Sequence, residues 1–412
     1  MSDDTPLIRI NSNSNIRKYS EDESEYYLDQ DDDLSHYGLF TKFIAYVLCI
    51  ILGLGTLYFF TIFLPDTFIP ESTDLVGIQK ISNINVYLNP ISQERVSELQ
   101  MGVKNVGSPE QYDEYENENE QDYQSITDSK LKPVERIILI GDIHGHYTQF
   151  RKLLSSINYK KETDHLIVLG DFITKGPDSS KVLDYLIAND IDCILGNHEY
   201  YVLQNYALFH NLDQPFFVIP QENNDISLAE SYEFKIKDNF NSDPEYILAR
   251  KLQPEHVKYI NHCSVIKHLG DVPVVKSKST SFAPGIAVHA GIRWDLELNE
   301  QDPEDNLEMR SYLGPYFNET TSDPSEEDAI SWSKIFNMKQ KERASNGDNT
   351  LVVYYGHDAH RGLNIKRYAK GIDSGCDAGK QLTAMVIWKE SHISKKGKEN
   401  ILFKEKSFQV QC

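Results

Sequence analysis

Residues 136–146, RIILIGDIHGH, decide the fold class, because an apolar strand runs directly into a loop that carries acidic and imidazole side chains. A helix-compatible stretch follows as far as Ile157. The pattern returns twice: HLIVLG runs into DFITKG before a helix predicted over 180–189, and CILG then runs into NHEY. Short apolar strands that alternate with helices predict an α/β domain with polar loops at the carboxyl ends of its strands.

Residues that can bind metal follow five of the predicted strands, each beside a small Gly or Ala. They are Asp142, His144, Asp171, Asn197, His198, His289 in IAVHAG and His357 in LVVYYGHDAH. Singly, an Asp after a strand is usually a turn former or helix cap, and a lone His is usually a core residue. Together, their oxygen and imidazole donors suit a divalent ion such as Zn, Mn or Fe(II). We therefore predict a dinuclear metal site with Asp171 as the bridging carboxylate.

The ordered motifs GD-x-HG, GD-x-x-x-x-G, GNHE, HAG and GH, spread over about 136–388, resemble those of the calcineurin-like metallophosphoesterases, in particular the phosphoprotein-phosphatase branch. The resemblance implies a four-layer α/β/β/α sandwich with two divalent ions, zinc in the first place and Mn, Co or Fe as alternatives. It implies a first metal held by Asp142, His144 and Asp171, and a second held by Asp171, Asn197, His289 and His357.

The same resemblance implies in-line attack on phosphorus by a hydroxide that the two metals activate, with Asp171 and His198 as catalytic residues. His198 would be the general acid that protonates the leaving oxygen. The stretches GIDSGC and 289–310 are similar to bacterial and diadenosine-tetraphosphatase-like members, whereas DFITKGPDSS and GHDAHRGLNI are similar to the zinc-dependent endopolyphosphatases of fungal vacuoles. The expected activity is internal cleavage of inorganic polyphosphate; the alternatives are diadenosine polyphosphate hydrolysis and serine/threonine protein phosphatase activity.

The second motif departs from the GD-x-x-DRG of protein phosphatases, since this chain reads GDFITKG. Thr174 replaces the carboxylate that supports the general acid. A phosphoanhydride releases an already acidic phosphate, so this change favours polyphosphate or a dinucleoside polyphosphate over phosphoprotein. Lys175 replaces the Arg and keeps its positive charge. Lys175 and Arg361 are expected to bind phosphate, and His360 is expected to be a surface histidine outside the ligand set.

The chain is predicted to contain four parts: a disordered acidic tail over 1–42, a transmembrane helix over 43–64, an acidic stalk over 65–130, and the phosphoesterase domain over 131–412. Residues 43–64 carry no charge and would form a helix about 33 Å long, enough for a hydrocarbon core of about 30 Å. Within the domain, 200–284 is an insertion, helical over 243–269, that could form a cap. The net charge of −22 argues against a nucleic-acid partner.

The charge rule barely specifies the orientation of the helix, because one basic residue lies near each of its ends, Lys42 on one side and Lys80 on the other. The few basic residues of the tail and a sequon at Asn318 favour a cytosolic tail. We therefore expect a single-pass type II protein with a glycosylated lumenal domain, and the resemblance implies a vacuole membrane. The five cysteines contain no close pair, which predicts no disulfide scaffold and leaves the redox compartment open. Cys193 and Cys376 are expected to be small buried apolar residues.

Overall fold

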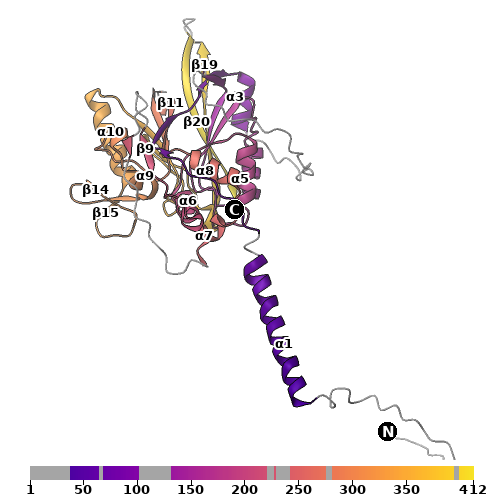
Figure 1. The fold of residues 1–412 in the computed structure, drawn as a ribbon. Helices are drawn as coiled ribbons and strands as arrows, with labels where there is room; N and C mark the ends of the chain where they lie inside the picture. The colour runs from indigo at the N-terminus through magenta and orange to yellow at the C-terminus, as the bar shows by residue number, and fades with distance from the viewer. Residues whose placement is uncertain are drawn as a thin grey trace, which may run out of the picture. The chain divides into compact units, whose positions relative to one another are not determined.

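The computed structural model describes residues 38–64, 68–101, 131–219, 227–228, 242–274, 281–393 and 399–412 (Figure 1). The chain divides into two compact units, Met1–Phe68 and Ile69–Cys412. The tail expected over 1–42 lies outside the described residues as far as residue 37.

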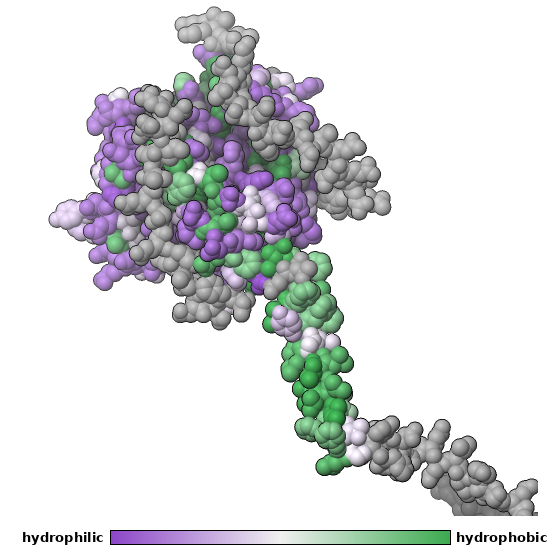
Figure 2. Space-filling model, viewed as in Figure 1, coloured by the Kyte–Doolittle hydropathy of each residue, from purple (hydrophilic) through white to green (hydrophobic). Residues whose placement is uncertain are grey.

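The first unit contains helix α1 (Leu39–Tyr58), which continues as the π-helix η1 (Phe59–Phe63). Neither segment has a buried residue, and Figure 2 shows their apolar surface. By length and composition the helix is sufficient to cross a membrane. It begins four residues before the helix predicted over 43–64, because Leu39 and Phe40 extend the apolar run.

The first large sheet has the strand order β20-β19-β6-β7-β8. Its strands are β6 (Arg136–Ile140), β7 (Asp164–Val168), β8 (Asp192–Cys193), β19 (Gln381–Ile393) and β20 (Glu399–Gln411). Strands β6, β7 and β8 are parallel, and β19 is antiparallel to β6. The three alternating strands expected from the sequence are confirmed as β6, β7 and β8.

The second large sheet has the order β17-β18-β16-β12-β11-β2. Its strands are β2 (Ile81–Asn83), β11 (Ile266–Val274), β12 (Ser281–Val288), β16 (Val352–Tyr355), β17 (Asn364–Ile365) and β18 (Ala369–Gly371). Glu405 of β20 joins the two sheets, since it accepts hydrogen bonds from Tyr354 at 2.7 Å and from Lys370 at 2.5 Å. Lys370 is fully buried, so this ion pair lies between the sheets.

Helices cover the outer faces of both sheets. Helix α4 (Tyr147–Ser156) packs against β19 and β20 beside α5 (Ser179–Ala188). It buries Phe150, Leu153 and Leu154, which share one face at helical spacing. Helix α10 (Trp332–Asn346) covers the second sheet, where the ring of Trp332 lies 4.7 Å from that of Tyr355. The layered α/β architecture expected from the sequence is therefore present.

The stalk expected over 65–130 differs from the structure in residues 78–101. This segment forms β1 (Ile78–Gln79), β2, β3 (Val86–Leu88), β4 (Pro90–Ile91) and α3 (Gln93–Met101). Its strands pair with β9 (Phe217–Ile219), β11, β5 (Lys132–Val134) and β19, in that order. Strands of two or three residues carry no readable period, so the sequence pattern did not indicate them. The acidic part of the expected stalk lies outside the described residues.

The insertion also differs from its prediction. The helix expected over 243–269 is divided into α7 (Pro244–Ala249) and α8 (Pro254–His262), and its last residues belong to β11. Both helices place a proline at their first position, which starts a helix readily and cannot continue one. Between α6 (Asn197–His210) and α7, the described residues of the insertion contain β9 and β10 (Ser227–Leu228), which pair with each other.

The remaining elements are short. They are η3 (Leu298–Glu300), α9 (Pro303–Glu308), η4 (Cys376–Ala378) and the small sheet of β13 (Ser311–Leu313), β14 (Glu319–Thr321) and β15 (Ala329–Ser331).

The expectation of unpaired cysteines is wrong. Cys193 is bonded to Cys263, and Cys376 is bonded to the terminal Cys412. The paired residues are 70 and 36 positions apart, so neither pair could be found from local spacing. Cys193 and Cys376 are buried as expected, but as disulfides.

Candidate metal centre

The loops that follow β6, β7, β8, β12 and β16 bring the expected site residues together. Non-glycine residues in left-handed backbone are concentrated in these loops: His144, Asp171, Thr174, Lys175 and His357 have φ between 45° and 68°. Such conformations cost free energy and are retained mainly where a site requires them. The backbone of these loops is therefore arranged for the side chains that they present.

Glycines next to these residues allow the loops to approach one another. A Cβ on Gly356 would lie 2.3 Å from Oδ1 of Asp142, and one on Gly196 would lie 2.4 Å from the backbone nitrogen of Asp171. Glu199 then fixes the Asp171 loop, because its buried carboxylate accepts hydrogen bonds from the backbone nitrogens of Asp171 at 2.6 Å, Ile173 at 3.1 Å and Gly196 at 3.1 Å.

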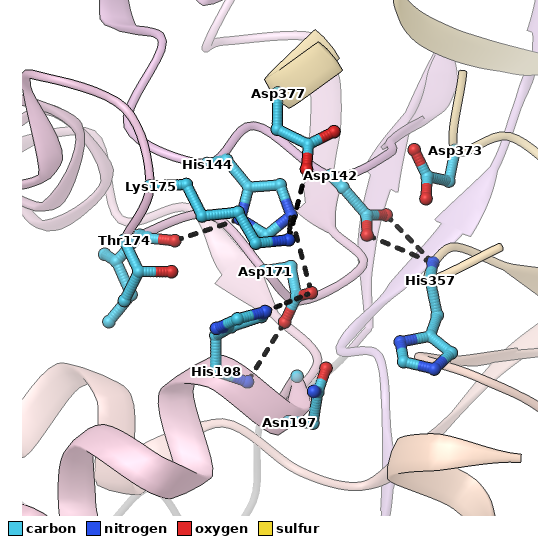
Figure 3. Close-up of polar contacts among 12 residues, drawn as sticks. Asp142, His144, Asp171, Thr174, Lys175, Asn197, His198, His357, Asp373 and Asp377 are labelled. Atoms are coloured by element: carbon cyan, nitrogen blue, oxygen red, sulfur yellow. Dashed lines mark hydrogen bonds and ion pairs between the residues drawn. The ribbon is translucent and has the colours of Figure 1, made fainter. Parts of the chain in front are cut away.

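Asp171 lies at the centre of the cluster (Figure 3). Its Oδ2 is 3.6 Å from Nε2 of His144 and 3.8 Å from Nε2 of His198, while its Oδ1 is 3.4 Å from Nε2 of His289. Two sets of possible ligands result, His144–Asp171–His198 and Asp171–His289–His357, with the donor atoms of each set within 4.8 Å of one another. Both sets contain Asp171, the residue expected to bridge two ions.

The imidazoles of the three expected histidine ligands are oriented by backbone carbonyls. Nδ1 of His289 lies 2.7 Å from the oxygen of Leu169, Nδ1 of His144 lies 3.3 Å from that of Ile173, and Nε2 of His357 lies 3.1 Å from that of Glu308. A ring nitrogen that donates to a carbonyl leaves the lone pair on the other nitrogen, which is the usual arrangement around a bound metal.

Asn197 gives an independent test of whether a cation fits. Its Oδ1 faces acceptors, with Nε2 of His289 at 3.1 Å, and exchanging the amide oxygen and nitrogen would instead produce hydrogen bonds to Asp171. A cation between Asn197, Asp171 and His289 would satisfy the present orientation. The chemistry of the donor set thus fits the dinuclear site that the family implies.

Burial and mutual repulsion shift the pKa values of these groups. Burial, together with the carboxylates of Asp373 and Asp171, raises the pKa of Asp142 well above its usual range. Burial also opposes ionisation of Asp171, but His289 and His198 more than offset it and hold its pKa well below the usual value. Burial lowers the pKa of His144 to about 4. A neutral imidazole beside crowded carboxylates is the state that binds a divalent cation.

His198 has a carboxylate partner, so the expectation that Thr174 leaves the general acid without one is wrong. Nδ1 of His198 lies 2.6 Å from Oε1 of Glu245, a residue of α7. Burial lowers the pKa of His198, but Asp171 and Glu245 reverse this effect and raise it overall. Glu245 follows His198 by 47 positions and belongs to the insertion, so no motif spacing could have indicated it.

The expected phosphate-binding residues lie in different surroundings. Nζ of Lys175 is 3.0 Å from Nε2 of His144 and 3.2 Å from Oδ2 of Asp377, within the cluster. The guanidinium of Arg361 instead donates to Asp358 at 2.6 Å and to Ser311 at 3.0 Å. The guanidinium of Arg310 donates to the carbonyl oxygen of His357 at 3.4 Å.

His360 is exposed, which confirms the expectation of a surface histidine.

Two further carboxylates adjoin the cluster from the GIDSGCD segment. Asp373 lies beside Asp142 (Figure 3), and burial raises its pKa to about 6. Asp377 is paired with Lys175. The sequence pointed to this segment only through resemblance, without a role for either residue.

The chain resembles known phosphoesterases. Residues 135–358 match the family of calcineurin-like phosphoesterases. The zinc-dependent endopolyphosphatase of Saccharomyces cerevisiae is 30% identical over 302 residues, which cover 69% of this chain and 86% of that protein. The symmetrical bis(5′-nucleosyl)-tetraphosphatase of Wigglesworthia glossinidia brevipalpis is 48% identical, but over 17% of this chain and 26% of its own length.

Among solved structures, that of a candidate diadenosine tetraphosphatase aligns with a TM-score of 0.45 and 21% identity, covering 66% of this chain and 94% of that one. The family match extends over more than half of the chain. The chain therefore belongs to the calcineurin-like phosphoesterase family and is a metal-dependent hydrolase.

Proposed function

We propose that this protein is a membrane-anchored phosphatase that cleaves phosphoanhydride bonds inside long chains of inorganic polyphosphate. One observation carries the choice of substrate: the 30% identity with the yeast zinc-dependent endopolyphosphatase extends over most of both chains. The resemblance to the tetraphosphatases covers a much smaller part of each protein. Diadenosine polyphosphates and phosphoproteins are therefore the alternative substrates.

The residues of the cluster divide into two sets of metal ligands in this proposal. Asp142, His144 and Asp171 would hold one divalent cation. Asp171, Asn197, His289 and His357 would hold the other, with zinc as the first choice. Bound there, the two cations would stabilise negative charge on the phosphoryl oxygens and acidify a water.

The other side chains bind substrate and move a proton. His198 holds a proton on Nε2, which faces the cluster, and gives it to the leaving oxygen. Lys175, whose ammonium lies beside His144, would contact a phosphate of the polyphosphate substrate. Arg361 would reach phosphate only if its pair with Asp358 opened, so Arg310 beside His357 is the nearer candidate.

We also propose a type II orientation with the catalytic unit in the lumen of the vacuole. Helix α1 supports an anchor by its length and apolar surface. The two disulfides support an oxidising compartment, since such bonds are rare in the cytosol. Asn318 of the sequon is exposed at the start of β14, where a glycan can be attached.

Incubation of the purified full-length chain in detergent with long-chain polyphosphate tests the proposal. We expect products of intermediate length on a gel with zinc, manganese or cobalt, and an unchanged ladder with Asp171→Asn. Diadenosine tetraphosphate and a phosphopeptide, tested in parallel, distinguish the alternatives. An intact ladder together with hydrolysis of either one would overturn polyphosphate as the substrate.

A further inference from the structure

We propose that Glu245 is a positioning residue for His198, and that this pair equips the site to release alcohol leaving groups in addition to phosphate. The inference rests on the proposed role of His198 as general acid. It gives the site a wider substrate range than polyphosphate, because phosphomonoesters of alcohols depend more strongly on protonation of the leaving oxygen.

The position of Glu245 is fixed by its surroundings. Its side chain is 2% exposed, and its backbone nitrogen donates to Oδ1 of Asp243, the N-cap of α7, at 3.1 Å. Helix α7 packs against α6 (Asn197–His210), which begins with the residues that reach the cluster. A second contact between these helices is made by the rings of Phe209 and Tyr246, 6.1 Å apart. The carboxylate and the imidazole are therefore held by two helices in contact.

The two nitrogens of His198 face different groups. Nε2 points toward the cluster, 3.8 Å from Oδ2 of Asp171, while Nδ1 faces Glu245 at 2.6 Å. The ring of His144 lies 5.1 Å away, edge-on. Because Glu245 accepts a hydrogen bond from Nδ1, it fixes the ring orientation and leaves Nε2 to serve the substrate.

In this chain the carboxylate that supports His198 does not come from the second motif, where Thr174 stands. This threonine stands where related protein phosphatases carry the acidic residue of the second motif, and its Oγ1 has no hydrogen-bond partner among the described residues. Its backbone is left-handed, with φ 68°, which is unfavourable for a β-branched residue. The insertion thus supplies from α7 what the second motif no longer supplies.

The pair of His198 and Glu245 assists cleavage of the bond between phosphorus and the alcohol oxygen. The attacking water has already given one proton to solvent, and its oxygen forms the new bond to phosphorus. The bond from phosphorus to the alcohol oxygen breaks, its electron pair stays on that oxygen, and the proton of Nε2 of His198 completes the alcohol. His198 then regains a proton from solvent, while the Nδ1 proton stays in the hydrogen bond to Glu245.

The test uses Glu245→Gln in the full-length chain with aryl phosphates of increasing leaving-group pKa. We expect kcat to fall about 10- to 100-fold for phenyl phosphate and less than about threefold for 2,4-dinitrophenyl phosphate, with KM and zinc content unchanged. Glu255→Gln is the matched control, because Glu255 follows the first proline of α8 as Glu245 follows that of α7, but is exposed. We expect it to behave as the wild type.

A double-mutant cycle separates positioning from a general effect on folding. In a His198→Ala background, Glu245→Gln should cause no further loss of kcat. Should the Gln variant not fold, Glu245→Asp keeps the charge and is expected to show a smaller loss with the same order of substrates. An equal loss on all leaving groups, or an undiminished loss in the His198→Ala background, would overturn the proposal.

These outcomes are independent of the proposed substrate. A wild-type protein that hydrolyses aryl phosphates with this dependence on Glu245 but leaves polyphosphate intact would refute the polyphosphatase and retain the pair. A wild-type protein that shortens polyphosphate, with a uniform effect of Glu245→Gln, would do the reverse.

Discussion

Lys175 makes a contact in the cluster that a bound cation would have to break. Its ammonium lies 3.0 Å from Nε2 of His144, the atom that offers its lone pair to the centre. Two cations cannot share that position, so metal binding should move Nζ outward, where Asp377 already provides a partner at 3.2 Å. The residue can then serve two purposes in turn, as a placeholder for a metal and as a contact for phosphate.

We therefore expect Lys175→Ala to bind zinc more tightly and to bind polyphosphate less well. Removing the competing charge should lower the dissociation constant for zinc, and losing a charged phosphate contact should raise KM about tenfold, the equivalent of 1.4 kcal/mol. A zinc titration against a competing chelator and steady-state kinetics measure the two effects. Lys181→Ala, on α5 and paired with Asp178, is the control. Weaker zinc binding with an unchanged KM would contradict this role.

The metal-ligand candidates that the sequence indicated share one property. Each follows a strand by a few residues and lies near a glycine. Asp142, Asp171 and His289 could be found in this way because local order places them at one edge of the sheets. Glu245 could not, because its distance from His198 is set by the packing of α7 on α6. Asp373 likewise could not be found, because it follows β18 of the second sheet and lies beside Asp142, which follows β6 of the first, only through the packing of the two sheets.

Strands and helices divide in the same way, into those that the local sequence predicts and those that depend on distant contacts. The strands β6, β7 and β19 are apolar runs bounded by turns, so their pattern predicts them without knowledge of their neighbours. The short strands β1 to β4 exist because each finds a partner strand across the sequence. Arg95 of α3 reinforces this docking, 3.5 Å from Glu135 and 3.8 Å from Asp164. Such pairing is a tertiary property, which one sequence does not display.

Strands β7, β8 and β11 are joined by a partly buried charge network that predicts how stability depends on pH. Oδ1 of Asp192 is 2.6 Å from Nζ of Lys267, and Oδ2 is 3.3 Å from Nε2 of His165. Burial opposes the charge of Asp192, but the contacts with His165 and Lys267 outweigh it and lower its pKa to about 2.

Because the folded pKa lies below the unfolded value of about 3.9, this carboxylate stabilises the fold above pH 4 and loses its contribution as pH falls toward 2. We expect Asp192→Asn to lower the free energy of unfolding by about 2 kcal/mol at pH 5 and by much less near pH 2. Urea unfolding of both proteins across this range measures the difference. A constant difference at every pH would show that Asp192 acts through packing alone.

The disulfide between Cys193 and Cys263 joins β8 to the residue after α8, and so ties the insertion to the strand that leads into Asn197. Replacing both residues by Ala should lower the free energy of unfolding by about 2–4 kcal/mol, mainly because the unfolded chain gains freedom. The Cys376–Cys412 pair closes a loop of about half that length, so its removal should cost about 0.6 kcal/mol less. Urea unfolding with and without reductant tests both, and a reduced wild type as stable as the oxidised one would contradict the prediction.

At the scale of the whole molecule, the net charge of −22 does not favour a polyanionic substrate, so attraction must be local. The cations of the metal centre, Lys175 and Arg310 would provide it. Anchoring by α1 would hold the catalytic unit close to a membrane surface. The disulfides favour an oxidising compartment for that unit, because such bonds are rare in the cytosol. The side of the membrane on which the catalytic unit lies is therefore the property to test.

Glycosylation of Asn318 reports this orientation directly. Asn318 is exposed, and Thr320 of its sequon is held in β14 by a hydrogen bond to Asp305 at 2.5 Å. A glycan transferase acts only on the lumenal side, so a lumenal catalytic unit should migrate faster on a gel after glycosidase treatment, and Asn318→Gln should abolish that shift. Protease added to sealed vesicles should then digest the N-terminal tail and spare residues 69–412. An unshifted band together with digestion of the catalytic unit would place it in the cytosol, where neither the two disulfides nor a vacuolar substrate would be expected.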